Sequence, residues 1–359
     1  MEASDRLTAA ELRLATRNHG LLLEALSHDL TPAGLHYLLV HYDIPAVDAT
    51  SWRLTLDGRV GRVSSLSLDE LRALPARTLA VTLECAGNGR ALLSPRPVSQ
   101  PWLLEAVGTA EWTGTSLSAL LEAAGVAEDA VEVLFRGLDR GVEGGEVQYY
   151  ERSLSLSDAL RDEVLVAWAM NGEPLPPQHG FPARLIVPGW YGMTSVKWLD
   201  RITVLDQPFE GYQQTRSYRL RRTPDEPGKA VSKVLPRSLM VPPGIPDFAT
   251  RDRRLEAGPC TVRGRAWSGL GPIERVDVSV DGGGSWSSAV LGRPRSQWSW
   301  VSWQWDWDAV PGVHEVCCRA IDAGGNEQPL EPAWNLGGYA NNEVQRLAVT
   351  VTPSRRRPV

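Results

Sequence analysis

Cysteine is the residue type in this chain with the clearest potential for metal or nucleophilic chemistry. Among 359 residues there are four cysteines, and Cys85 lies in the glycine-rich run VTLECAGNGR, closely followed by Arg90. A lone cysteine is more often a small buried hydrophobic residue than a ligand. Its thiolate, which a neighbouring arginine favours, is also a soft ligand suited to a metal that changes oxidation state. Taken alone, the residues leave both interpretations open.

Other common chemical motifs have little support. The six histidines are scattered, and the sequence contains no H-E-x-x-H and no C-x-x-C, so a zinc site and c-type haem attachment are not expected. The run Gly87-Asn88-Gly89 lacks the G-x-G-x-x-G spacing, and nothing matches a P-loop or a G-x-S-x-G elbow. We therefore expect neither nucleotide binding nor serine hydrolysis.

Composition indicates an ordinary folded protein. Hydrophobic residues make up 43% and charged residues 22%, which excludes a disordered or fibrous chain. The net charge of −6 argues against nucleic acid as a partner. The cysteines form no disulfide framework, and we see neither a secretory signal nor an apolar run long enough for a membrane span. We expect a cytoplasmic protein that does not bind membranes.

The elements around Cys85 are predicted to mix α and β structure. Residues 51–58 alternate as a strand does, Ser67-Leu-Asp-Glu70 forms a capping box that opens a helix to about Leu74, and a strand over 79–83 leads into the Cys85 loop. A second helix is expected at 115–124, ended by Gly125. Further strands fit residues 131–135, 164–170, 183–188 and 196–205.

The second half of the chain is predicted to be all β. Residues 206–259 are rich in Pro, Gly and charges with little periodicity, which indicates a connection between domains. From Cys260 onward, short alternating segments separated by turns are typical of a β-sandwich. Trp303, Trp305 and Trp307 share one strand face, which favours core or interface over a ligand site. The predicted units are 1–207, 208–352 and a flexible tail at 353–359.

Several long segments resemble the sulfite oxidase family of molybdopterin-dependent oxidoreductases. VTLECAGNGR is similar to the loop whose cysteine ligates molybdenum, and residues 102–114 and 171–202 are similar to other motifs of the cofactor domain. Segments from CTVRGRAWSG to PAWNLGGYANN look like the dimerisation domain. The resemblance implies an α+β cofactor-binding domain followed by an immunoglobulin-like sandwich, with molybdenum and molybdopterin as cofactors and Cys85 as the metal ligand.

The resemblance also implies roles for individual side chains. Tyr150 matches the tyrosine that the family places beside the molybdenum, with Tyr149 as the competing assignment, and a phenol there can donate a hydrogen bond or move a proton. Arg90 matches an arginine of the substrate anion pocket. The residues expected to hold the pterin and its phosphate are Asp43, Asp139, His179, Arg184, Ser195 and Lys197.

Two departures from the family pattern change the expected anion pocket. The family motif V-R-N-H-L-P aligns with residues 40–45, so that His41 replaces an arginine that binds substrate. The motif W-N-L-R-G aligns with residues 334–338, so that Gly337 replaces a second arginine. Arg17-Asn18-His19 offers an R-N-H triplet, but a long insertion would separate it from the aligned site, and we do not expect it to substitute. With Arg90 alone retained and a pH-dependent His41, we expect sulfite to be a poor substrate.

Three functions stay open at this point. The resemblance favours a molybdenum oxidoreductase that carries out two-electron oxygen-atom transfer on a small molecule. The alternatives are a reductase of S-oxides on the same metal centre and a non-catalytic binding protein that keeps the fold. Because the sequence contains no haem motif, we expect a separate electron donor or acceptor, and the dimerisation domain predicts a homodimer.

Overall fold

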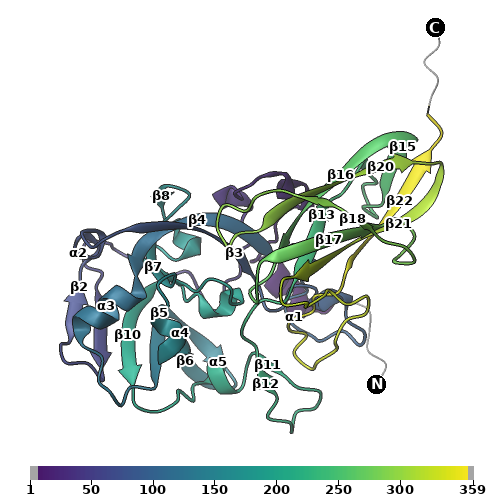
Figure 1. The fold of residues 1–359 in the computed structure, drawn as a ribbon. Helices are drawn as coiled ribbons and strands as arrows, with labels where there is room; N and C mark the ends of the chain where they lie inside the picture. The colour runs from purple at the N-terminus through teal and green to yellow at the C-terminus, as the bar shows by residue number, and fades with distance from the viewer. Residues whose placement is uncertain (1–6, 355–359) are drawn as a thin grey trace.

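Two β-rich parts lie side by side in the computed structural model, which describes residues 7–354. Figure 1 shows the first part from purple to teal and the second from green to yellow, in contact near the middle of the molecule. Among the described residues, no helix is long and apolar enough to cross a membrane. The tail predicted at 353–359 lies mostly outside the described residues.

One mixed sheet and one antiparallel sheet build the first part. One has the strand order β2-β1-β10-β5-β6, and the other has the order β3-β4-β7-β8 with β9 also paired to β7. Their apolar faces enclose a core that includes Leu54, Leu117, Phe135 and Ile202. The strands are β1 Leu54–Gly58, β2 Ser64–Leu66, β3 Arg77–Glu84, β4 Val107–Ser116, β5 Glu132–Glu143, β6 Glu146–Ser155, β7 Leu165–Met170, β8 Glu173–Pro174, β9 Arg184–Ile186 and β10 Leu199–Leu205.

Local signals correctly predicted two helices of this part. The helix α2, Leu68–Arg72, begins with the predicted capping box, in which the Ser67 side chain accepts from the Glu70 N–H and the Glu70 carboxylate accepts from the Ser67 N–H. It ends slightly earlier than predicted. The helix α3, Leu117–Ala124, ends at Gly125, whose φ of 70° is left-handed and suits glycine. A short helix α4, Leu156–Ala159, follows β6.

The second part is a sandwich of two sheets, as predicted. One sheet has the order β13-β16-β20-β19 and the other the order β14-β15-β22-β21-β17-β18. Trp303 and Trp307 are buried between the sheets with Trp305 packed on the same core, which confirms the predicted core stripe. The strands are β13 Arg237–Val241, β14 Ile245–Pro246, β15 Arg253–Glu256, β16 Gly258–Trp267, β17 Ile273–Ser279, β18 Ser287–Ser288, β19 Val290–Leu291, β20 Val301–Ala309, β21 Gly312–Asp322 and β22 Gln345–Thr352.

Residues 206–259 do more than connect the two parts. They form the helix α5, Tyr212–Thr215, and the small hairpin of β11, Arg219–Leu220, and β12, Lys229–Ala230. They also supply β13, four of whose five residues are buried in the sandwich. The prediction of a plain connection was therefore wrong, because short buried strands flanked by prolines show no periodicity.

The N-terminal segment spans both parts of the molecule. The helix α1, Ala9–Ala15, begins with a capping box between Thr8 and Glu11. After it, the short 3-10 helix η1, Leu23–Ser27, packs on β13 and β16. Leu21 and Leu26 share an apolar cluster with residues from both parts. Packing therefore does not divide cleanly at residue 207.

Candidate active site

Cys85 lies between two hollows of the molecule. The inner cavity, of about 60 Å³, is lined by residues of the first part together with Tyr218. The outer pocket, of about 290 Å³, is lined by the N-terminal segment, the Cys85 loop and residues of the C-terminal half. Leu39, His41, Cys85 and Tyr218 line both hollows. Cys85 therefore borders both hollows.

The Cys85 loop leaves the end of β3 and is held by backbone contacts. The Cys85 N–H donates to the Ala106 carbonyl at 2.9 Å, and the Asn88 N–H donates to the Cys85 carbonyl at 3.0 Å. Burial raises the pKa of the Cys85 thiol, while Arg90 and the Gly87 N–H oppose that rise. A metal ion would overcome the remaining cost, because a coordinating thiol is deprotonated outright.

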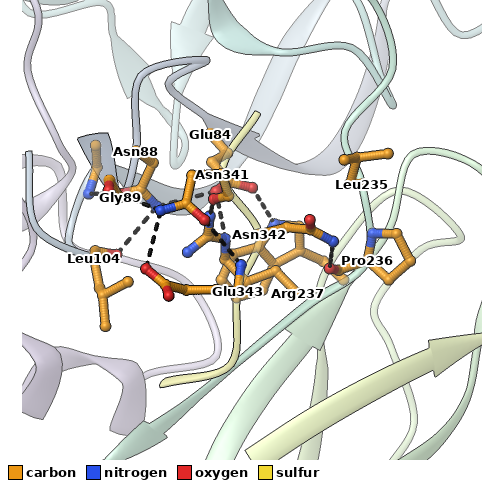
Figure 2. A network of polar contacts seen from close by, with 12 residues as sticks. Glu84, Asn88, Gly89, Leu104, Leu235, Pro236, Arg237, Asn341, Asn342 and Glu343 are labelled. Atoms are coloured by element: carbon orange, nitrogen blue, oxygen red, sulfur yellow. Dashed lines mark hydrogen bonds and ion pairs between the residues drawn. The ribbon is translucent and has the colours of Figure 1, made fainter. Parts of the chain in front are cut away.

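Polar contacts with the second part fix this loop (Figure 2). Glu84 forms an ion pair of 2.7 Å with Arg237, and each side chain is only 1% exposed. The Trp267 indole also donates to Glu84 at 2.8 Å. Further along, the Asn341 side chain donates to the Gly89 carbonyl at 2.9 Å. The sandwich therefore orders the loop that carries Cys85.

The inner cavity gathers buried cationic and neutral basic groups around one acid. Burial and the charge of Arg184 lower the pKa of Lys197 to about 7. Burial also raises the pKa of Asp139, the one carboxyl group among the described lining residues, to about 7. Three buried polar atoms there, His36 Nε2, Asp139 Oδ1 and Arg184 Nε, have no hydrogen-bond partner within the protein. A polar, anionic ligand would satisfy these groups.

Most of the predicted site residues come together around the inner cavity. Arg90 lines the outer pocket, and Tyr149 lies away from both hollows with its ring 4.8 Å from the Arg136 guanidinium. The Ser195 hydroxyl accepts from the Val187 N–H at 3.1 Å. The predicted residues that line the inner cavity are His41, Cys85, Asp139, Tyr150, His179, Arg184, Ser195 and Lys197.

Asp43 is the exception among the predicted cofactor residues. It is exposed, and its carboxylate accepts from the Ile44 N–H at 2.7 Å. It lines neither hollow. The structure therefore places Asp43 apart from the other predicted cofactor residues, and its cofactor role stays a prediction.

His41 belongs to a cluster of aromatic side chains beside Cys85. Its Nε2 atom lies 2.6 Å from the Tyr218 hydroxyl, and its ring centroid lies 4.6 Å from that of Tyr150. The Tyr150 hydroxyl donates to the Met193 carbonyl at 2.7 Å. Burial, with the charges of Lys197 and two arginines, lowers the pKa of His41 to about 3. The imidazole is therefore neutral at physiological pH.

Tyr339 occupies the space beside Gly337 in the outer pocket. A Cβ atom at position 337 would overlap the Tyr339 ring. The Arg90 Nε donates to the Gly337 carbonyl at 2.9 Å, its Nη1 donates to the Gln100 carbonyl at 3.2 Å, and its guanidinium lies 5.0 Å from the centre of the Tyr339 ring. An aromatic wall and backbone carbonyls thus surround the one buried arginine of this pocket.

Sequence reasoning missed several residues of the outer pocket, among them Arg17, Tyr218 and Tyr339. Arg17 lines the pocket although we did not expect its triplet to substitute for an arginine, and the Thr8–Glu11 capping box was the signal for the helix that precedes it. Tyr218 has a left-handed φ of 51°, which is unusual for tyrosine. It lies in residues 206–259, where no sequence pattern singles it out.

No side-chain cluster in residues 7–354 could hold a metal ion by itself, since no group of three or more His, Cys, Asp or Glu side chains is suitably close. A metal at Cys85 would therefore need further ligands from a cofactor. The unpartnered polar atoms and the basic groups of the inner cavity fit such a cofactor if it carries a phosphate.

Family models match most of the chain. The model of the oxidoreductase molybdopterin binding domain matches residues 41–213. The model of the Mo-co oxidoreductase dimerisation domain matches residues 244–352. These two matches correspond to the α+β part and the β-sandwich.

Similar proteins include sulfite oxidases and a sulfane dehydrogenase. Mitochondrial sulfite oxidase of Homo sapiens is 38% identical over 345 residues, which is 90% of this chain and 62% of that protein. Sulfite oxidase of Gallus gallus is 38% identical over 88% of this chain and 72% of its own length. The crystal structure of the sulfane dehydrogenase SoxCD from Paracoccus pantotrophus matches with a TM-score of 0.78 and 28% identity, over 91% of this chain and 83% of that chain.

This chain spans about three fifths of the human relative, whose name places it in mitochondria. The expected cytoplasmic location stays a prediction. The family itself follows from the two domain matches and from the extent of the similarity to sulfite oxidases. The chain belongs to the sulfite oxidase family of molybdopterin-dependent oxidoreductases, and its cofactor is molybdenum bound to molybdopterin.

Proposed function

We propose that this protein catalyses two-electron oxygen-atom transfer to or from the sulfur of a neutral or monoanionic compound, and that sulfite is a poor substrate. The observation that carries the proposal is the outer wall at Cys85. His41 and Gly337 align with two arginines of the family motifs. Burial lowers the pKa of His41, and the Tyr339 ring fills the space beside Gly337. Among the described residues, this leaves Arg90 as the buried cation of the pocket.

The inner cavity suits the molybdopterin cofactor. Arg184 and Lys197 would hold its phosphate, Asp139 and His179 would bind polar atoms of the pterin, and the Cys85 thiolate would ligate the metal. When bound, the cofactor supplies a metal centre that exchanges an oxygen atom and two electrons with sulfur. The protein supplies burial, orientation and charge around that centre.

The residues on the outer side would bind and orient the substrate. Arg90 is held by two backbone carbonyls and offers a fixed cation to an oxygen of the substrate. Tyr218 lines both hollows and Tyr150 lines the inner cavity, and their hydroxyl groups would hold a substrate oxygen or move a proton. Trp102 and Tyr339 limit the access of water to this end of the pocket.

The overall reaction balances in either direction. Oxidation of a sulfide takes an oxygen atom from water, yields the S-oxide, and releases two protons and two electrons. Two equivalents of a one-electron acceptor such as ferricyanide take up the electrons. Reduction of an S-oxide is the reverse, with a reduced low-potential dye as donor.

Charge explains why sulfite should be a poor substrate. Each charge-assisted hydrogen bond contributes about 1.5–3 kcal/mol. The loss of two such contacts weakens binding of a divalent anion by about two to four orders of magnitude. With its pKa near 3, His41 offers no compensating charge at neutral pH.

Steady-state assays on the purified holoenzyme test the proposal. We expect turnover of sulfides with ferricyanide or of S-oxides with a reduced dye, together with a high KM for sulfite. A low-micromolar KM for sulfite at neutral pH would contradict the proposed substrate class. Absence of turnover with every sulfur compound would support the non-catalytic alternative. If protein purified from molybdenum-replete cells contains no molybdenum and shows no pterin fluorescence, the assignment as a molybdenum oxidoreductase is contradicted.

We further propose a homodimer that exchanges electrons with a separate partner. Support comes from the match of the dimerisation-domain model to residues 244–352. Light scattering during gel filtration tests the dimer, for which we expect twice the chain mass of 39.3 kDa. A species with the mass of a single chain at micromolar concentration would contradict it.

A further inference from the structure

We propose that Arg17 is a second anion-binding residue of the outer pocket, and that the substrate carries an anionic group, such as a carboxylate, remote from its reacting sulfur. This inference rests on the proposed oxygen-atom transfer and narrows the substrate class. Arg17 would act on substrate binding and not on the chemical step.

The backbone around Arg17 is anchored on both sides. Before it, Glu11 of α1 is fully buried and forms an ion pair with Arg96, from the loop that follows Cys85. After it, the Asn18 side chain donates to Gln100 at 2.9 Å and accepts from the Val40 N–H at 2.8 Å. These contacts fix the N-terminal segment against the mouth of the outer pocket.

The Arg17 side chain reaches the pocket lining beside His41. Its Nη2 donates to the His41 carbonyl at 3.0 Å. The charges of both Arg17 and Arg90 lower the pKa of His41, so both guanidinium groups act on the same part of the pocket. They are the two arginines among the described residues that line the outer pocket.

The two arginines lie at different depths. Arg90 is 5% exposed and Cys85 is 7% exposed, whereas Arg17 is exposed to solvent. A ligand that contacts both arginines must therefore extend from the metal side of the pocket to its mouth. The pocket, at about 290 Å³, has more room than a single small anion needs.

The pocket also disfavours a diffuse negative charge. Glu143 lines it, held by the Tyr42 hydroxyl at 3.1 Å and by the Gln213 side chain. A localised anion near Arg17 and a neutral S-oxide near Arg90 suit this distribution better than a dianion at Cys85.

A matched pair of substrates tests the inference by turnover. We would compare 3-(methylsulfinyl)propanoate with its neutral amide in the wild-type holoenzyme, in Arg17→Ala and in Arg17→Lys. We expect the wild type to prefer the carboxylate by about tenfold or more in kcat/KM, through KM at unchanged kcat. Arg17→Ala should lose the preference and Arg17→Lys should keep part of it. Arg13→Ala, which removes an exposed arginine of α1 outside the pocket, should change nothing.

Binding provides a readout that does not depend on turnover. Calorimetry with 3-(methylsulfonyl)propanoate, a sulfone analogue, should show about tenfold weaker binding to Arg17→Ala, which corresponds to about 1.4 kcal/mol. High salt should weaken binding to the wild type more than to Arg17→Ala, because an exposed cation is screened.

The possible outcomes separate the two proposals. Arg17-dependent sulfone binding without turnover of any sulfur compound would contradict the proposed function and leave the role of Arg17 standing. The role of Arg17 would be overturned if the wild type and Arg17→Ala turned over the substrates with the same preference for the carboxylate over the amide. It would also be overturned if the wild type bound the carboxylate and the amide equally.

Discussion

The inner cavity and the outer pocket meet at Cys85 but are assembled in different ways. Asp139, His179, Arg184, Ser195 and Lys197 all come from one stretch of the first part, within the match to the molybdopterin-binding domain. The outer pocket draws on the N-terminal segment, the Cys85 loop, residues 206–259 and the sandwich. A family can therefore keep its cofactor chemistry while its substrate chemistry changes.

The two hollows also differ in electrostatics. Buried basic groups crowd the inner cavity, and their lowered pKa values indicate that the protein alone does not compensate them. The outer pocket instead has aromatic rings, a neutral His41 and one buried guanidinium whose hydrogen bonds go to backbone carbonyls. The inner cavity is suited to a strongly anionic ligand, and the outer pocket to a weakly charged one.

Replacement of Cys85 should have the largest effect because this residue belongs to both hollows. We expect Cys85→Ser to abolish turnover and to lower molybdenum content with an unchanged circular dichroism spectrum, because a hydroxyl is a harder and more basic ligand. Cys260→Ser is the control and should keep wild-type turnover. Full turnover in Cys85→Ser would place the metal elsewhere.

The buried pair Glu84–Arg237 supports the loop between the hollows. Glu84→Gln should lower the free energy of unfolding by about 3–5 kcal/mol in urea, because it leaves a buried charge without its partner. The double variant Glu84→Gln/Arg237→Met should recover part of the loss. Asp129→Asn, which breaks an exposed ion pair with Arg59, should change little. If Glu84→Gln and Asp129→Asn lower the free energy of unfolding equally, this account of the loop is contradicted.

Arginine substitutions should make the outer pocket more like that of the family motif. We expect His41→Arg to lower the KM for sulfite by about tenfold or more, since one charge-assisted contact contributes about 1.5–3 kcal/mol. Gly337→Arg alone should not help, because the Tyr339 ring fills the space. The pair Gly337→Arg/Tyr339→Ala removes that obstacle and should lower the KM. If neither His41→Arg nor the double variant Gly337→Arg/Tyr339→Ala changes the KM for sulfite, charge does not limit sulfite binding.

Replacement of Lys197 should have the smallest effect of these substitutions. The direction of its effect on stability with pH follows from the lowered pKa of Lys197. Its pKa is lowered to about 7 from an ordinary value of 10.5, so the unfolded chain binds more protons between these values. Folding of cofactor-free protein is therefore penalised by Lys197 below pH 10.5, and this contribution improves as the pH rises from 7 to 10.5.

The cofactor-free Lys197→Met variant should have a higher Tm at pH 7 than the cofactor-free wild type and should lose that pH dependence. Its cofactor content should fall, because the phosphate loses a cation. Arg201→Met, at a partly exposed ion pair with Asp57, is the control for cofactor content and should retain it. A lower Tm together with unchanged cofactor content would mean that Lys197 serves the fold only.

Local and contiguous features could be predicted from the sequence. The capping box at Ser67–Glu70, the stop at Gly125 and the tryptophan stripe from Trp303 to Trp307 depend on neighbours in the chain. The predicted members of the inner cavity followed from long motifs, and Asp43, assigned in the same way, lies outside it.

The outer pocket could not be predicted in the same way. Tyr218 and Tyr339 reach it from distant segments, and Arg17 reaches it through α1 and not through alignment with a motif. Even the pKa of His41 depends on burial and on distant charges that the sequence does not display. Tertiary packing, which brings such segments together, determines these features.

Anomalous diffraction at the molybdenum edge, from crystals of the holoenzyme containing 3-(methylsulfonyl)propanoate, tests the central claim most directly. We predict one metal peak at bonding distance from Cys85 Sγ, pterin density in the inner cavity and sulfone density in the outer pocket. A metal peak away from Cys85, or pterin and sulfone density in the same hollow, would contradict the division of the site at Cys85.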